Sequence, residues 1–167
     1  IKSTGSWYLV KRTNGEIIEA RIRGKLRTKG LRTTNPVAVG DIVSLEKNED
    51  NFVITEIGER RNYIIRKSTN LSKEAHIIAS NVDQTLLIAT INHPVTSAVF
   101  IDRILATTEA YNIPAILVFN KSDLYDNTDR EKATELITIY SEIGYRCLQV
   151  SAVTGQNITE LRELLKD

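Results

Sequence analysis

The chain has 167 residues, of which 41% are hydrophobic and 26% are charged, a balance typical of an ordinary globular protein. Its apolar runs, such as 115–119, are far shorter than the roughly 20 residues that a transmembrane helix needs. Residues 1–10 lack the pattern of a secretory signal. A single cysteine, Cys147, excludes an internal disulfide framework, so we expect a reducing, cytoplasmic compartment and no membrane partner.

No metal site is predicted in this chain. The two histidines are far apart in sequence and there is no second cysteine, so no zinc-ligand spacing can be recognised. Methionine is absent, including at position 1, which predicts a processed protein or an excised part of a longer one.

Charge is distributed unevenly between the two halves of the chain, although the net charge is only +1. Residues 1–70 carry 14 Lys and Arg against 8 Asp and Glu, whereas residues 71–167 carry 8 against 13. A basic half joined to an acidic half indicates a module that binds a polyanion beside a module of another kind. We therefore predict a domain over 1–70 and a second over 71–167.

The first half has the pattern of an all-β domain. Asn14-Gly15 between two alternating segments is a strong hairpin signal, and further turn residues separate the later segments. Five short strands separated by turns favour a closed barrel of the OB-fold type. The predicted strands are 7–12, 16–26, 42–45, 52–54 and 57–65.

Cations alternate along the second predicted strand and the start of the loop after it. Because strand side chains alternate between faces, these cations share one face of the sheet. We predict that this face binds a phosphate backbone, and RNA in particular, although lysines at a sheet edge also protect against aggregation. The candidate RNA-binding residues are Arg21, Arg23, Lys25, Arg27 and Lys29, followed by Arg32 in the loop.

The second half changes to a pattern of strands alternating with helices. Residues 84–91, 115–119 and 146–150 are predicted strands, and the apolar run 115–119 is typical of a strand buried on both faces. Helices are predicted over 96–111, 129–143 and 158–165, with Phe100, Ile104, Leu105 and Thr108 inward on the first and Leu136, Ile137, Tyr140 and Ile143 on the second. The alternation predicts a parallel α/β sheet, so the fold class of the chain is β followed by α/β.

Polar residues follow two of these predicted strands. The segment Asn120, Lys121, Ser122, Asp123 comes directly after the buried strand, and Ser151-Ala152 comes directly after the last one. Ligands of parallel α/β sheets bind beyond the carboxyl ends of the strands, so we expect both segments to line one site.

The residue types in these segments suit a guanine base. Guanine presents two parallel N–H donors on one edge, and the Asp123 carboxylate can accept both in a charge-assisted pair. Asn120 offers a donor and an acceptor, and the aliphatic stem of Lys121 can cover the flat ring. Backbone N–H groups of Ser151 and Ala152 could contact the guanine carbonyl oxygen. The alternative is a purely structural role, in which these polar residues form an Asx turn that caps a loop.

The pattern N-K-x-D after a buried strand, then S-A after the next, resembles the base-specificity motifs of Ras-like P-loop GTPases. Those proteins carry a phosphate loop, G-x-x-x-x-G-K-[ST], before the base motif. Residues 1–167 contain no such loop, and the only Gly-Lys pair is Gly24-Lys25. A basic barrel followed by base motifs, with the phosphate loop expected later, resembles the circularly permuted GTPases of small ribosomal subunit biogenesis, the RsgA (YjeQ) type. The segments 81–84, 101–105 and 154–161 are also similar to that family.

The resemblance implies a monomeric, cytoplasmic GTP hydrolase that acts late in maturation of the small ribosomal subunit and binds its rRNA. GTP is the substrate and GDP the product. Mg²⁺ and Zn²⁺ are expected only in the complete family protein, since residues 1–167 hold no ligands for them and no catalytic residue. We therefore expect a truncated chain that cannot hydrolyse GTP alone.

A second hypothesis belongs to another class of protein. The chain would be a non-catalytic, OB-type RNA-binding module whose α/β half carries a vestigial nucleotide-binding site. A phosphate loop downstream of Asp167 would favour the enzyme, and its absence would favour the binding module.

Overall fold

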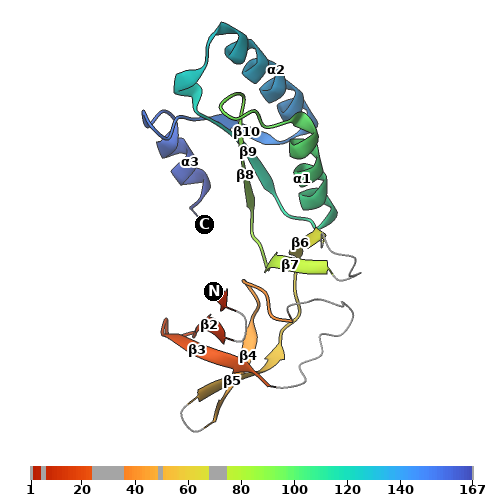
Figure 1. Cartoon of the computed structure of the whole chain (residues 1–167), viewed down its shortest axis with the longest axis vertical. Coiled ribbons are helices and arrows are strands. Elements are labelled where there is room, and N and C mark those ends of the chain that lie inside the picture. The colour runs from red at the N-terminus through yellow and green to blue at the C-terminus, as the bar shows by residue number, and fades with distance from the viewer. Residues whose placement is uncertain (1, 5–6, 24–35, 49–50, 68–74, 167) are drawn as a thin grey trace. The chain divides into compact units, whose positions relative to one another are not determined.

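The computed structural model describes residues 2–4, 7–23, 36–48, 51–67 and 75–166 (Figure 1). They belong to two compact units, Ile1–Val82 and Asp83–Asp167, each built on its own sheets. In the part of the chain that is described, no helix has the length and apolar character needed to cross a membrane.

A five-stranded sheet forms most of the first unit. Its strands are β1 (Lys2–Thr4), β2 (Trp7–Lys11), β3 (Ile17–Ile22), β4 (Val43–Asn48) and β5 (Asn51–Ile57), in the order β1-β2-β3-β5-β4. Neighbouring strands are antiparallel except β3 and β5, which run parallel. Between the residues described, no ladder joins β4 back to β1.

The β2–β3 hairpin confirms the turn predicted at Asn14-Gly15. Gly15 has a φ of +87°, a conformation that costs glycine nothing because it has no Cβ. Asn14 Oδ1 accepts a hydrogen bond of 3.1 Å from Glu16 N, which closes the turn locally.

Three features of this unit differ from the prediction. Strand β1 was not expected, because its three residues are too few to show a period. Within the described residues β3 ends at Ile22 instead of continuing to residue 26. The segment 57–65 is not a fifth strand of the sheet: β6 (Tyr63–Lys67) pairs with β7 (Ala75–Ser80) in a separate two-stranded sheet. This sheet belongs to the first compact unit, so the unit extends past the change of composition at residue 70.

The core of the first unit lies on one face of the five-stranded sheet. Tyr8, Ala20 and Ile54 come from three adjacent strands and are buried together with Val37. On β3 the residues alternate strictly, since Ile18, Ala20 and Ile22 point inward while the residues between them are exposed. The other face of β2 and β3 therefore remains accessible.

A buried ion pair fixes the loop before β4. Arg60 donates to both carboxylate oxygens of Asp41, at 2.7 and 2.6 Å, and the two side chains are 11% and 0% exposed. Asp41 also accepts from Ser80 Oγ at 2.5 Å and from Ala38 N at 2.8 Å. Burial alone would raise the pKa of Asp41, but these hydrogen bonds outweigh it and hold the pKa below its usual value.

Gly40 lies in the same loop and has a φ of +92°. A Cβ at this position would lie 1.9 Å from the carbonyl oxygen of Ser80, far inside contact distance. Only glycine fits here, because β7 passes directly against the loop. Asn81 Nδ2 donates to the carbonyl oxygen of Gly40 at 3.0 Å and closes the contact.

The second unit confirms the predicted parallel α/β pattern. Its strands are β8 (Thr85–Thr90), β9 (Ala115–Asn120) and β10 (Arg146–Gln149), all parallel, in the order β10-β9-β8. Strand β9 is central, and its four residues 116–119 are buried on both faces, as its uninterrupted apolar sequence predicted.

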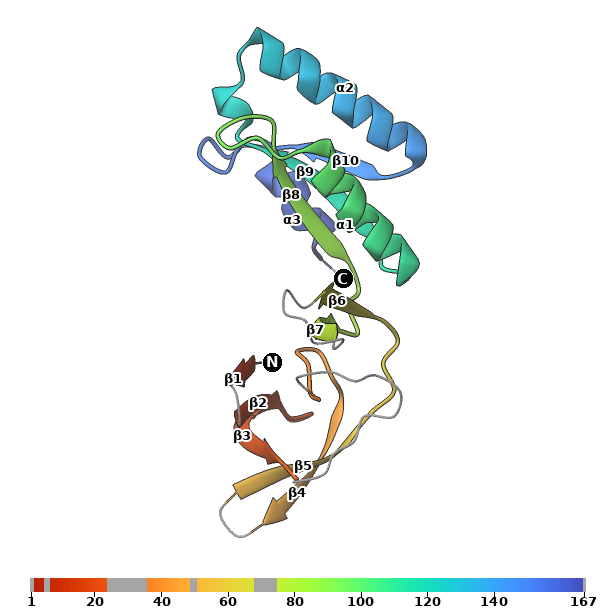
Figure 2. The same cartoon turned by 45° about the vertical axis from the view of Figure 1, so that its right-hand side comes forward.

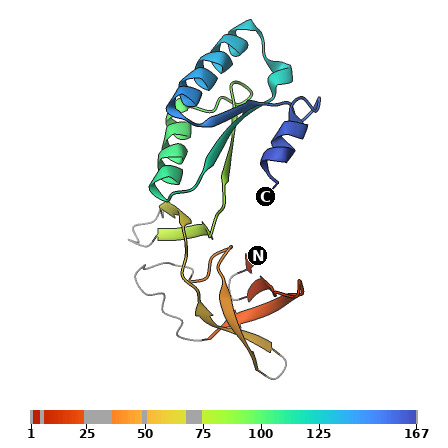
Figure 3. The ribbon, with the colours of Figure 1, turned by 180° about the vertical axis from the view of Figure 1, so that it is seen from behind.

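Helices cover both faces of this sheet (Figures 1 and 2). Helices α1 (Ala98–Ala110) and α2 (Asn127–Ile143) pack on the face that carries Leu117 and Phe119. The short helix α3 (Ile158–Leu164) packs on the opposite face, over Ile116 and Val118. The view from behind shows the same two layers of helix around the sheet (Figure 3).

The helix ends lie within two residues of the predicted ones, since α2 begins at Asn127 instead of residue 129, and the buried faces agree with the sequence except at two residues. Ser97 caps α1 through its Oγ, which accepts from Phe100 N, and Gly144 ends α2 with a φ of +108°. Phe100 is half exposed, because the buried stripe of α1 runs through Ile101, Leu105 and Thr108. Ile143, the last residue of α2, is exposed as well.

A hydrogen bond joins the two helices on the same face. Tyr140 Oη donates to Asp102 Oδ1 at 2.8 Å, and Tyr140 is buried. Burial, together with this hydrogen bond, raises the pKa of Tyr140 to about 12.

Candidate functional site

The two polar segments singled out by the sequence lie side by side at the carboxyl ends of β9 and β10. The parallel register pairs Phe119 with Gln149, so the chain leaves both strands at the same edge. Val150 N donates to the carbonyl oxygen of Phe119 at 2.8 Å, and Ser122 N donates to that of Val150 at 3.1 Å. These backbone bonds extend the contact beyond the strands into the loops.

Asn120 connects the two loops. Its Oδ1 accepts a hydrogen bond of 3.1 Å from Ala152 N, and its backbone carbonyl accepts one of 3.1 Å from Tyr125 Oη. Tyr125 is buried beneath the loop, and burial raises its pKa to about 12, so the phenol is a donor at neutral pH. Asn120 therefore holds the first loop against the second.

Asp123 and Ser151 form the second connection. Asp123 lies in the short 3-10 helix η1 (Ser122–Leu124) and is exposed, whereas Ser151 is fully buried. Ser151 Oγ donates to Asp123 Oδ1 at 2.5 Å and accepts from Thr154 N at 3.1 Å. The carboxylate is thus oriented by a buried hydroxyl and keeps acceptor capacity for two parallel donors.

Lys121 has a left-handed backbone conformation immediately before η1. Its φ is +68°, in the left-handed region that side chains with a Cβ rarely adopt. Its Nζ donates to the carbonyl oxygen of His93, in the loop that follows β8. The Lys121 side chain therefore links the base-motif loop to a third loop at this edge of the sheet.

The backbone donors expected to meet a guanine carbonyl oxygen already have acceptors in the chain. Ser151 N donates to the carbonyl oxygen of Gln156 at 3.1 Å, and Ala152 N donates to Asn120. A ligand oxygen at this position would have to share or replace one of these bonds.

Sequence reasoning missed several residues that support the site. Gln156 Oε1 accepts from Ser122 Oγ at 2.9 Å, and Asn157, with a φ of +56°, donates from Nδ2 to the carbonyl oxygen of Gln149 at 2.8 Å. Both lie in the 154–161 segment, but only the loop geometry shows their roles. A polar groove of about 430 Å³ borders the site, and Ser122 is the one predicted residue that lines it; the lining is Ser122, Arg130, Thr134, Gln149 and Gln156.

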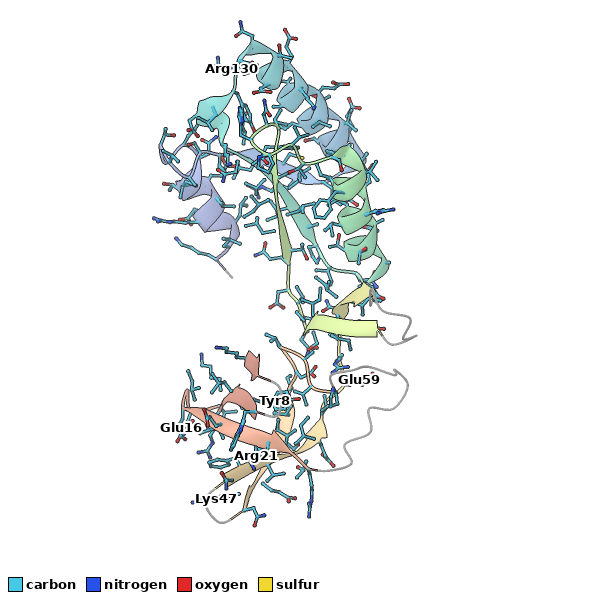
Figure 4. The ribbon with its side chains drawn as sticks, viewed as in Figure 1. Tyr8, Glu16, Arg21, Lys47, Glu59 and Arg130 are labelled. Atoms are coloured by element: carbon cyan, nitrogen blue, oxygen red, sulfur yellow. The ribbon has the colours of Figure 1, made fainter. Side chains whose placement is uncertain are left out.

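Of the predicted RNA-binding residues, the structure describes Arg21 and Arg23, and both are exposed (Figure 4 labels Arg21). The Arg21 guanidinium lies over the ring of Trp7, 3.8 Å from its centroid. Arg23 forms an exposed ion pair of 3.1 Å with Glu46. The other four candidates, Lys25, Arg27, Lys29 and Arg32, lie outside the described residues.

Among the residues whose placement is described, no group of three His, Cys, Asp or Glu side chains lies close enough together to hold a metal ion.

Comparison with known proteins places the chain in a family. A model of the RsgA GTPase matches residues 57–167, and a model of the RsgA N-terminal domain matches residues 1–53. A small ribosomal subunit biogenesis GTPase RsgA from Bacteroides fragilis is 52% identical over 99% of this chain and 54% of its own length. The corresponding protein of Flavobacterium psychrophilum is 51% identical over 99% of this chain and 52% of its own length.

Solved structures give the same result. YjeQ from Thermotoga maritima is 37% identical, with a TM-score of 0.69 over 92% of this chain and 50% of that one. YloQ, described as a circularly permuted GTPase, is 27% identical, with a TM-score of 0.71 over all of this chain and 55% of that one. The chain spans about half the length of the relatives it matches. On the strength of the family match, which extends over most of its residues, this chain belongs to the RsgA GTPase family.

Proposed function

We propose that this chain recognises the guanine base of GTP and GDP. The observation that carries the proposal is the pair of hydrogen bonds, Asn120 to Ala152 and Asp123 to Ser151, that holds two polar loops at one edge of the sheet. Such an edge is where parallel α/β folds bind ligands. The proposed guanine-binding residues are Asn120, Lys121, Ser122, Asp123, Ser151 and Ala152.

Each group has a distinct role in this proposal. The Asp123 carboxylate accepts the ring N–H and the exocyclic amino group of guanine, a donor pair that adenine lacks. The stem of Lys121 covers the ring, with its ammonium group held at the carbonyl of His93. The Ala152 N–H, which donates to Asn120 in the free chain, is shared with the guanine carbonyl oxygen.

The wider activity is proposed from the family match, and the matched relatives are about twice as long as this chain. We propose a cytoplasmic GTP hydrolase that acts in late maturation of the small ribosomal subunit and contacts its rRNA through the basic first unit. Phosphoryl transfer depends on held phosphates, Mg²⁺ and an oriented water. Residues 1–167 contain no phosphate loop, so this chain alone is expected to bind guanine weakly and to release no phosphate from GTP.

Nitrogen-15 NMR of the chain, titrated with GDP and with ADP, tests the base site. We expect GDP to shift the amide signals of residues 120–125 and 151–154, and ADP to leave them in place. Equal shifts with both nucleotides, or none with either, would contradict the proposal. If neither nucleotide shifts the signals, the favoured hypothesis becomes an RNA-binding module with a vestigial nucleotide site.

A phosphate-release assay separates base recognition from hydrolysis. The chain alone should release no phosphate from GTP, with or without small ribosomal subunits. A full-length protein containing this sequence should do so, and faster when subunits are added. Release by the chain alone would show that catalytic groups lie within residues 1–167 and would refute this part of the proposal.

A further inference from the structure

Trp7 and Arg21 form a stacked pair on the accessible face of the five-stranded sheet. The β2–β3 register pairs Tyr8 with Ala20, which puts Trp7 and Arg21 opposite each other on the other face. The Arg21 guanidinium carbon lies over the indole ring, 3.8 Å from its centroid. The Arg21 side chain, labelled in Figure 4, is exposed, so the guanidinium contacts the indole and is also accessible to a ligand.

The other exposed arginines of the unit are engaged differently. Arg12 lies over Phe52 at 5.6 Å, but Phe52 packs into the core and Arg12 binds Glu16 at 2.7 Å. Arg23 binds Glu46. Among the ion pairs between described residues, none involves Arg21. Its partner is an aromatic ring instead of a carboxylate.

The surroundings of Arg21 favour a base over a phosphate group. Glu19 is exposed two residues before Arg21 on the same face of β3. Across the sheet, Arg21 of β3 pairs with Val53 of β5, and Val53 pairs with Glu46 of β4, which is also exposed. Two carboxylates beside one arginine weaken its attraction for a phosphate anion. They do not hinder a neutral nucleobase, which stacks on a guanidinium plane or an aromatic ring through its flat face.

We propose that Trp7 and Arg21 form a stacking platform for an unpaired base of single-stranded RNA. This inference rests on the proposed rRNA binding of the first unit and specifies how part of that binding works. Trp7 contacts the guanidinium, Arg21 presents this group to the base, and cations elsewhere in the unit meet the backbone. The contact depends on planarity as well as on charge, so lysine cannot replace arginine at this position.

The chain contains one tryptophan, so its fluorescence reports on this platform directly. The full chain is titrated with a dye-labelled 12-residue oligoadenylate, followed by anisotropy for binding and by Trp7 emission for stacking. Inorganic polyphosphate serves as a polyanion without bases. We expect oligoadenylate to change the Trp7 emission and polyphosphate to leave it unchanged. An equal change with both polyanions would overturn the platform.

Two variants isolate the role of planarity. Arg21→Lys keeps the charge, so we expect the salt dependence of binding to stay the same while the affinity falls roughly fivefold or more and the emission change is lost. Arg12→Lys is the matched control, because Arg12 is also an exposed arginine of this unit but is already paired with Glu16 at 2.7 Å; the affinity of this variant should stay within about twofold of that of the parent chain. Equal behaviour of Arg21→Lys and the parent would refute the inference.

The outcomes also separate this inference from the function on which it rests. Salt-dependent binding of oligoadenylate without any change in Trp7 emission would leave RNA binding in place and remove the platform. No binding at low salt would refute both. Neither result bears on guanine recognition, which involves residues of the other compact unit.

Discussion

The buried hydroxyl of Ser151 donates a hydrogen bond of 2.5 Å to the exposed carboxylate of Asp123, across two loops that follow different strands. Ser151 itself is fixed by Thr154 N. A carboxylate whose direction is set by a buried partner loses little freedom when a ligand arrives, which favours binding. In the proposed base site, the second loop therefore sets the direction of the carboxylate in the N-K-S-D segment.

Asp123→Asn should change which purine nucleotide is preferred. The amide places a donor where guanine also presents donors, whereas xanthine offers a carbonyl oxygen there. We expect the affinity for GDP to fall roughly tenfold or more and xanthosine diphosphate to become the better ligand. NMR titration with both nucleotides measures this. Glu131→Gln, an exposed carboxylate on α2, is the control and should leave the preference for GDP unchanged.

Asp41→Asn should destabilise the first unit strongly. It leaves Arg60, which is 11% exposed, without its carboxylate, and removing one partner of a buried pair costs about 3–5 kcal/mol. Urea unfolding followed by Trp7 fluorescence measures the free energy of unfolding of this unit. Glu16→Gln, which removes an exposed pair with Arg12, is the control and should have little effect.

The same ion pair predicts the response of the first unit to acid. The pKa of Asp41 is lowered in the folded chain, so the stabilisation is complete above the unfolded value of about 3.9. It is lost as the pH falls through the lower, folded value. We expect the urea midpoint to drop steeply below about pH 4 in the parent chain and less steeply in Asp41→Asn. Parallel pH profiles for the two proteins would contradict this account.

Gly40→Ala and Gly15→Ala separate backbone strain from steric collision. Both glycines have a positive φ, +92° and +87°, so both substitutions impose a backbone cost of about 1 kcal/mol. Only at Gly40 does the new Cβ meet another atom, the carbonyl oxygen of Ser80 at 1.9 Å. We expect Gly40→Ala to lower the free energy of unfolding clearly more than Gly15→Ala does. Equal losses in urea unfolding would show that β7 moves away without cost.

Tyr140→Phe should weaken the contact between α1 and α2. The variant loses the hydrogen bond to Asp102, worth about 1 kcal/mol, and keeps the packing of the ring. Because the pKa of Tyr140 is raised to about 12, its contribution is complete below about pH 10 and is lost as the pH rises toward 12. Circular dichroism during urea unfolding measures the free energy of unfolding at pH 7 and near pH 11. The difference between these two values should be smaller for the variant than for the parent chain. The variant still contains Tyr125, whose pKa is also raised to about 12, so part of the loss of stability near pH 11 remains.

Local sequence was sufficient to predict the strands and helices of the second unit and the position of its two polar loops. The apolar run before Asn120 and the short strand before Ser151 predict parallel neighbours, and parallel neighbours end at the same edge. The supporting contacts could not be predicted in the same way. Gln156 and the carbonyl of His93 reach the site through loops with positive φ, and no period in the sequence marks such loops.

The first unit was less predictable for a related reason. Two strands, β4 and β5, separate Asp41 from Arg60 in sequence, and only the fold brings them together. Arg60 lies in the segment after β5, which leaves the five-stranded sheet, and the apolar residues that follow form β6, which pairs with β7. Alternation within a segment predicts a strand but cannot tell which strand it pairs with.

All the groups proposed to recognise guanine lie between Asn120 and Ala152, and their supports Gln156 and Asn157 follow at once. Apart from the His93 carbonyl that holds Lys121, the proposed recognition edge is therefore specified by one short stretch of sequence, with small loops to close. We expect a growing chain to bring these groups together soon after this stretch has left the ribosome. In this order of motifs, the groups proposed to identify the nucleotide are synthesised together.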